Sequence, residues 1–165
     1  MKAIVAVDKN WGIGKDNDLL FSIPQDMKFF RQTTLNKVVV MGRNTLLSFP
    51  NGNPLKNRVN IVLSSTLQKE GCVIAKDLTA LLKEIKKYPQ DEVYVIGGAM
   101  LYKTLLPYCD EVLVTKVDAD GDAQVFFENL DALENFTCVY ESEVLEDNGY
   151  KFKFTTYKNS NVKAI

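Results

Sequence analysis

Apolar runs divide the chain into segments whose order indicates its fold class. Lys2–Val7 is an apolar run that ends at Asp8, which is typical of a strand buried on both faces of a sheet. Between Asp8 and Ser22 lies a polar, glycine-containing loop, and loops of that length are usually functional or mobile. Comparable apolar runs predict further strands over Lys37–Met41, Arg58–Leu63, Glu92–Ile96 and Glu111–Val117.

Helices are predicted between these strands. Aliphatic side chains recur at helical spacing in Asp77–Tyr88, and Ala99–Leu106 is expected to form a helix after a Gly-Gly break. The segment Ser22-Ile23-Pro24 predicts a helix start, with a capping hydroxyl nearby and proline in the first turn. A short helix is expected near Arg43–Phe49, before the turn-rich Pro50–Asn57.

The C-terminal part predicts a hairpin. Phe136–Leu145 and Tyr150–Tyr157 alternate in polarity, and Asp147-Asn148-Gly149 between them is a turn signal. Alternating strands and helices followed by a hairpin predict an α/β fold: a central, mostly parallel twisted sheet with an antiparallel C-terminal edge hairpin and helices on both faces. No repeat or linker interrupts the sequence, so residues 1–165 are expected to form a single domain.

Composition narrows the class of protein. At 46% apolar and 25% charged residues, the chain is neither disordered nor fibrous, and no apolar run approaches the roughly 20 residues of a membrane span. Its 3 cysteines are far apart and include no C-x-x-C, which favours a reducing, cytoplasmic environment. With no histidine, Ser-His-Asp and Cys-His nucleophile systems and histidine-based metal sites are excluded, and no metal is expected.

Charge is unevenly distributed along the chain. The net charge is −1, but basic residues outnumber acidic ones in residues 1–69, and acidic residues dominate residues 70–165. A nearly neutral protein with a basic first half is a poor nucleic-acid binder, yet it could hold a small anionic ligand there. Compositional drift is the alternative explanation.

Asp26 is the first candidate for chemistry. Ile23, Asp26 and Phe30 share one helix face, and that face should turn inward, placing a carboxylate against apolar surface. Burial would raise the pKa of Asp26, whereas the helix N-terminus would lower it. The alternative is an aspartate that only complements the helix dipole.

Three predicted strand ends carry groups suited to phosphate. Gly97-Gly98 would let backbone amides approach an anion at the start of a helix. Met41–Thr45 places an arginine fork at a similar junction, and Leu63–Thr66 ends in three hydroxyls. Each could instead be a plain turn, and neither a G-x-G-x-x-G fingerprint nor a P-loop is present. All three would lie along the carboxyl edge of one sheet.

In order and spacing, these segments resemble the bacterial dihydrofolate reductases from Met1 to about residue 158. The resemblance implies hydride transfer from NADPH to dihydrofolate, giving tetrahydrofolate, in a monomer that binds neither nucleic acid nor a membrane. It rests on Ile13-Gly14, Ile23-Pro24-x-Asp26 with Phe30, Val40–Arg43 with Thr45, Ser48-Phe49, Pro54-Leu55, Arg58, Asn60–Ser65, Val95–Ala99, Tyr102 and Val114-Thr115.

The same resemblance implies roles for individual residues. Asp26 would be the catalytic carboxylate at the pterin, Thr115 would support it, Arg58 would pair with the glutamate α-carboxylate, and the Gly97–Gly98 bond would be cis. The implied substrate-binding residues are Val5, Ala6, Asp26, Phe30, Phe49, Leu55, Arg58 and Thr115. The implied NADPH-binding residues are Ala6, Ile13, Gly14, Asn17, Asp18, Leu19, Gly42, Arg43, Asn44, Thr45, Leu63, Ser64, Ser65, Lys76, Ile96, Gly97, Gly98, Ala99, Met100, Leu101 and Tyr102.

Some positions depart from the family pattern. Leu20-Phe21 stands where Pro-Trp is common, Lys56-Asn57 replaces Pro-Gly, and Ala123 follows Gly121-Asp122 where threonine is usual. Two alternative functions remain open. One is the pyrimidine reductase of riboflavin synthesis, although the helix start at Asp26 and Arg58 suit a pterin-glutamate better. The other is a non-catalytic nucleotide-binding module, which would leave Asp26, Arg58 and Thr115 without a role.

Overall fold

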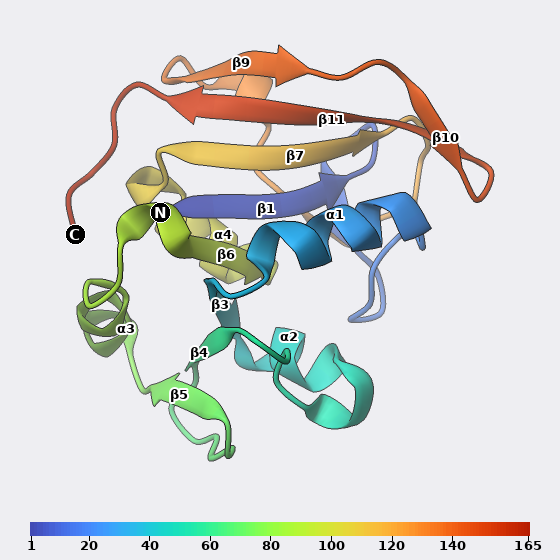
Figure 1. Ribbon diagram of the computed structural model, residues 1–165. Helices are drawn as coiled ribbons and strands as arrows, with labels where there is room; N and C mark the ends of the chain where they lie inside the picture. Colours follow the sequence, from blue (N-terminus) through green and yellow to red (C-terminus); the bar gives the residue numbers. More distant parts are fainter.

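The computed structural model describes residues 1–165 and is built around a nine-stranded sheet with the order β10-β11-β7-β1-β6-β3-β4-β5, in which β9 also pairs with β11 (Figure 1). The strands from β7 to β5 are parallel to one another, and the C-terminal strands are antiparallel. This arrangement confirms the predicted α/β fold. The parallel strands are β1 (Lys2–Val7), β3 (Val38–Gly42), β4 (Val59–Leu63), β5 (Cys72–Ala75), β6 (Val93–Gly97) and β7 (Glu111–Val117).

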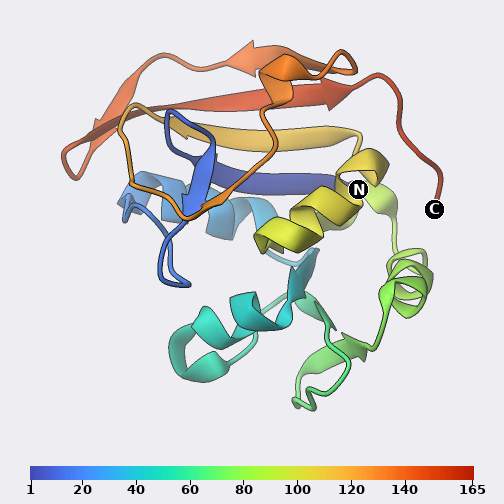
Figure 2. The same ribbon diagram turned by 180° about the vertical axis from the view of Figure 1, so that it is seen from behind.

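Helices cover both faces of the sheet, which explains why its strands are continuously apolar. Figures 1 and 2 show α1 (Pro24–Thr34) on one face and α4 (Ala99–Leu105) on the other. In β3, Val38 and Val40 join the large core under α4 and α3 (Leu78–Ile85), whereas Val39 and Met41 pack with Leu46 of α2 (Arg43–Ser48). The alternation of side chains along a strand therefore supplies two separate cores.

The antiparallel edge is formed by β9 (Phe136–Glu141), β10 (Leu145–Asp147) and β11 (Tyr150–Asn159). The turn between β10 and β11 uses positive φ at Asn148 (50°) and Gly149 (82°), as the Asn-Gly pair predicted. Single 3₁₀ turns occur at η1 (Pro50–Gly52), η2 (Gln90–Glu92), η3 (Leu106–Tyr108) and η4 (Leu130–Ala132).

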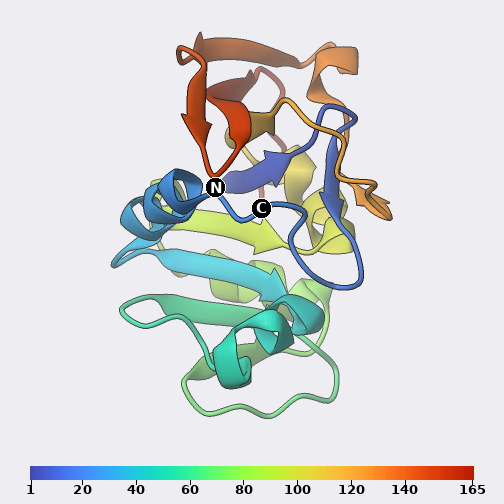
Figure 3. The ribbon, with the colours of Figure 1, turned by 90° about the vertical axis from the view of Figure 1, so that its right-hand side faces the viewer.

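Two features differ from the sequence prediction of the secondary structure. The edge strand β5 was not predicted, because it is four residues long and forms only by pairing with β4. The loop from Asp8 to Ser22 is not entirely irregular: it contains β2 (Gly12–Gly14), which pairs with β8 (Val125–Phe126). Figure 3 shows this loop beside the segment that carries β8. Both strands depend on distant partners, which local patterns do not reveal.

The prediction of a capping hydroxyl at the start of α1 is wrong. Ile23 is the N-cap residue, and no side chain of this segment caps the helix. Instead, the Gln25 backbone N–H donates to Asp147 Oδ2 at 2.9 Å, and Asn148 Nδ2 donates to the Ser22 carbonyl at 2.7 Å. The β10–β11 turn therefore caps the helix that carries Asp26.

Candidate active site

Asp26 lies in the first turn of α1, and its carboxyl group is held by β7. Thr115 Oγ1 donates a hydrogen bond to Asp26 Oδ1 at 2.7 Å. Burial raises the pKa of Asp26, and the bond from Thr115 partly opposes this because it stabilises the carboxylate. Asp26 Oδ2 has no protein partner and is not sealed from solvent, so it is available to a ligand.

A cavity of about 700 Å³ opens where β1, β3, β4 and β6 end. Each of these parallel strands contributes its carboxyl end, which is where ligands of open α/β sheets usually bind. The first loop, residues 8–22, and the second loop, residues 118–127, close the other side. The predicted cofactor residues that line this cavity are Ala6, Ile13, Gly14, Asn17, Asp18, Leu19, Gly42, Arg43, Asn44, Thr45, Leu63, Ile96, Gly97, Gly98, Ala99, Met100, Leu101 and Tyr102.

The glycines at the end of β6 permit a close approach to α2. The Gly97–Gly98 peptide bond is cis, as the resemblance implied. Gly97 has φ +136°, and a Cβ there would lie 3.1 Å from Thr45 Oγ1. Tyr102 of α4 donates from its hydroxyl to the Ile4 carbonyl at 2.7 Å, which ties this helix to β1. The backbone at Gly97 can therefore form the cavity wall close to Thr45, because glycine has no side chain there.

Three predicted cofactor residues, Ser64, Ser65 and Lys76, do not line the cavity. Ser64 Oγ instead accepts the Leu67 backbone N–H at 3.1 Å, and Ser65 and Lys76 are exposed beyond the cavity. Six lining residues were not predicted: Lys15, Asp16, Ser48, Thr104, Gln124 and Val125. Gln124 and Val125 belong to the second loop, whose approach to the first loop has no local sequence signal beyond the Gly121-Asp122 pair.

Only two of the predicted substrate residues line this cavity. Val5 and Ala6 line the cavity. Phe49 and Leu55 are partly buried against the small core that contains Leu46. Asp26, Phe30, Arg58 and Thr115 lie outside the cavity lining, and Phe30 is half-buried on the same helix as Asp26.

Arg58 directly precedes β4 and extends its side chain to the C-terminal end of α1, and its guanidinium bonds to three protein acceptors. Nε donates to Thr34 Oγ1 at 3.1 Å, one terminal nitrogen to the Lys56 carbonyl at 2.6 Å, and the other to the Arg31 carbonyl at 2.9 Å. Burial and the nearby charge of Arg31 lower the pKa of Arg58. No carboxylate pairs with either arginine, so the two charges favour an anion from outside the chain. Sequence reasoning missed Arg31.

The structure contains no group of three or more Cys, Asp or Glu side chains that could hold a metal ion. None of its helices is both long and apolar enough to cross a membrane.

Comparison with known proteins identifies the family. The family model described as dihydrofolate reductase matches residues 1–159. The dihydrofolate reductase of Bacillus subtilis is 37% identical over 96% of this chain and 94% of its own length. The enzyme of Haemophilus influenzae is 40% identical over 77% of this chain and 78% of its own length.

A solved structure agrees with the sequence comparisons. Dihydrofolate reductase from Enterococcus faecalis, complexed with NADP(H) and RAB-propyl, superposes with a TM-score of 0.81 at 32% identity, covering 96% of this chain and 95% of that one. The chain belongs to the dihydrofolate reductase family. It is an NADPH-dependent oxidoreductase that reduces dihydrofolate, and the two alternative functions are set aside.

Proposed function

We propose that Asp26 is the catalytic residue in the reduction of 7,8-dihydrofolate to 5,6,7,8-tetrahydrofolate. The observation that carries this proposal is the state of its carboxyl group, with Oδ1 tied to Thr115 and Oδ2 free of protein partners. A carboxyl group whose pKa is raised by burial holds a proton more readily than an exposed aspartate does, which suits it to proton exchange with a substrate. The chain has no histidine that could compete for this role.

The residues around Asp26 suit a flat heterocycle with an acidic tail. Asp26 Oδ2 would accept hydrogen bonds from the amino and ring-amide groups of the pterin, and its negative charge would favour protonation of the imine nitrogen through a water molecule. Phe30, Phe49 and Leu55 would supply the apolar walls. Arg58, which has guanidinium hydrogens beyond its three protein bonds, would hold the glutamate α-carboxylate.

The strand-end cavity fits a long, anionic cofactor. NADPH, when bound, supplies the hydride. Ala6, Ile13 and Gly14 would position the nicotinamide ring, and Gly97–Tyr102 would surround the pyrophosphate. Arg43 is exposed at the cavity and makes no ion pair within the protein, so it would hold the adenosine phosphate. Thr45 would contribute a hydroxyl. We further infer that the protein acts as a cytoplasmic monomer without a nucleic-acid partner.

The test is Asp26→Asn, which keeps the shape of the side chain and removes its charge. The rate of hydride transfer at neutral pH is expected to fall about a hundredfold or more, the range of general acid–base effects. NADPH affinity, measured by fluorescence titration, should hardly change, because Asp26 lies outside the cavity lining. A variant with near-native turnover would show that another group controls the proton.

A further inference from the structure

Asp8 is a buried carboxylate that the reaction does not use. It follows β1 directly, is 3% exposed, and forms no ion pair with a lysine or arginine. Its Oδ1 accepts the backbone N–H groups of Asn10 at 2.8 Å and Gly12 at 2.7 Å, both in the first loop. Its Oδ2 accepts the Gly121 backbone N–H of the second loop at 3.0 Å. Buried charge needs such partners, so this carboxylate is committed to joining two loops.

The two loops also contact each other directly at Gly12. A Cβ at Gly12 would lie 2.3 Å from Ala123 Cβ and 2.9 Å from both carboxylate oxygens of Asp8. The Gln124 backbone N–H donates to the Gly14 carbonyl at 2.8 Å. The first loop can therefore lie this close to the second loop only because position 12 lacks a side chain, and the Asp8 carboxylate is the buried side chain that bonds to both loops.

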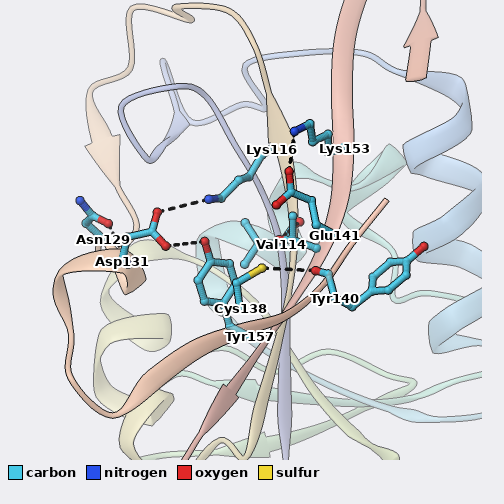
Figure 4. Close-up of polar contacts among 10 residues, drawn as sticks. Val114, Lys116, Asn129, Asp131, Cys138, Tyr140, Glu141, Lys153 and Tyr157 are labelled. Atoms are coloured by element: carbon cyan, nitrogen blue, oxygen red, sulfur yellow. Dashed lines mark hydrogen bonds and ion pairs between the residues drawn. The ribbon is translucent and has the colours of Figure 1, made fainter. Parts of the chain in front are cut away.

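Trp11 anchors the base of the first loop, residues 8–12, in the large core. It adopts φ +63°, which is rare for a bulky residue, and is nearly buried. Its ring contacts Phe127, with centroids 6.4 Å apart, and Lys116 Nζ lies 5.1 Å from its centre. Figure 4 shows Lys116 and Tyr157 both reaching Asp131, so the cation above Trp11 is itself held in place.

Immediately beyond this base, the first loop becomes the cavity wall. Ile13, Gly14 and the residues as far as Leu19 line the cavity, and Leu19 is 73% exposed. The bonds to Asp8 therefore lie directly beside the stretch of the first loop that lines the cavity. Small displacements at this point would move Ile13 and Gly14 relative to the end of β1.

We propose that Asp8 is a positioning residue for hydride transfer. By bonding to the amides of both loops, it holds Ile13 and Gly14 in the place where the nicotinamide ring must meet the substrate. This inference rests on the proposed placement of NADPH in the strand-end cavity. Asp8 does not line the cavity, so it would act only through the backbone of the two loops.

Asp8→Asn tests the link to the second loop selectively. The amide oxygen can still accept from Asn10 and Gly12, but the new NH₂ group would face the Gly121 N–H, donor against donor. The single-turnover rate of hydride transfer is expected to fall about tenfold or more, as for the loss of one hydrogen bond to a charged group. NADPH should also bind more weakly, whereas the affinity for dihydrofolate should stay close to the wild-type value, because Asp8 bonds to none of the predicted substrate-binding residues.

Asp110→Asn is the matched control. Asp110 pairs with the N-terminal ammonium at 3.6 Å, at the opposite end of the sheet. Asp110→Asn removes the same charge as Asp8→Asn. Its rate of hydride transfer, its NADPH affinity and its dihydrofolate affinity should all stay at wild-type values. A wild-type rate of hydride transfer in Asp8→Asn would overturn the proposal, as would an equal loss in Asp110→Asn or an equal loss of dihydrofolate affinity. Asp26→Asn would still lose hydride transfer in those cases, so failure here is distinguishable from failure of the proposed function.

A second pair of variants keeps the test decisive if Asp8→Asn does not fold. Gly12→Ala places a methyl group against Ala123 and the Asp8 carboxylate, and it should lower hydride transfer while sparing dihydrofolate affinity. Adding Ala123→Gly removes the 2.3 Å contact and should restore part of the rate, whereas Ala123→Gly alone should be nearly silent. Gly12→Ala with an unchanged rate would also overturn the proposal.

Discussion

Thr115→Val isolates the one interaction that stabilises the charged form of Asp26. The substitution keeps the side-chain shape and removes the hydroxyl that donates to Asp26 Oδ1 at 2.7 Å. Burial already raises the pKa of Asp26, and the bond from Thr115 is the opposing influence, so its loss should raise that pKa further. Hydrogen bonds to charged groups contribute about 1.5–3 kcal/mol, and 1.36 kcal/mol is a tenfold change in a dissociation constant.

The acid dissociation constant of Asp26 is therefore expected to fall about tenfold or more in Thr115→Val. The assay is the single-turnover rate of hydride transfer as a function of pH, with both ligands saturating. The midpoint of the pH profile that Asp26 controls should move to higher pH.

Thr155→Val is the control for this measurement. Thr155 lies on the adjacent strand β11, is 4% exposed, and donates from Oγ1 at the same 2.7 Å, but to the Val114 carbonyl. It therefore loses a comparable buried hydroxyl without touching Asp26, and its midpoint should stay at the wild-type pH. If Thr115→Val kept the wild-type midpoint, or if both variants moved alike, Thr115 would not control the protonation of Asp26.

Three further predictions follow from the charged residues of the site. Arg43→Ala should weaken NADPH binding much more than NADH binding in a titration, and equal losses would assign Arg43 to the shared pyrophosphate or to folding. Arg58→Ala should lower dihydrofolate affinity roughly ten- to a hundredfold but hardly affect a pterin without glutamate, and an equal loss on the truncated pterin would mean that Arg58 shapes the pocket. Asp26→Asn should raise the free energy of unfolding at neutral pH. A carboxyl group whose pKa is raised in the folded state makes the folded protein less stable as the pH rises above 3.8, the ordinary pKa of aspartate, and asparagine removes this effect. That gain should disappear in urea unfolding below this pH, and a gain that persisted in acid would exclude this cause.

The sequence alone determined which segments form the parallel strands and which strand ends carry candidate binding groups. Continuous apolar runs predicted the parallel strands, because a strand covered on both faces has no polar side. The glycines after β6 and the arginine after β3 marked strand ends, and parallel strands bring their carboxyl ends to one edge. The inward face of α1 at Asp26 also followed from helical spacing, since residues three and four apart lie on one side.

Tertiary structure decided the contacts between segments that no local pattern connects. Asp147 caps α1 from the far hairpin, Arg31 comes beside Arg58, and Asp8 bonds to Gly121. Each of these depends on how separate elements pack, and the residues involved have ordinary local surroundings in the sequence. Gly12 is the clearest case: its need for glycine comes from Ala123, which lies far along the chain and only 2.3 Å from where a Cβ would be. The steric limit at Gly12 and the amide that bonds to Asp8 both arise between segments that are far apart in the sequence. Only folding brings these segments together.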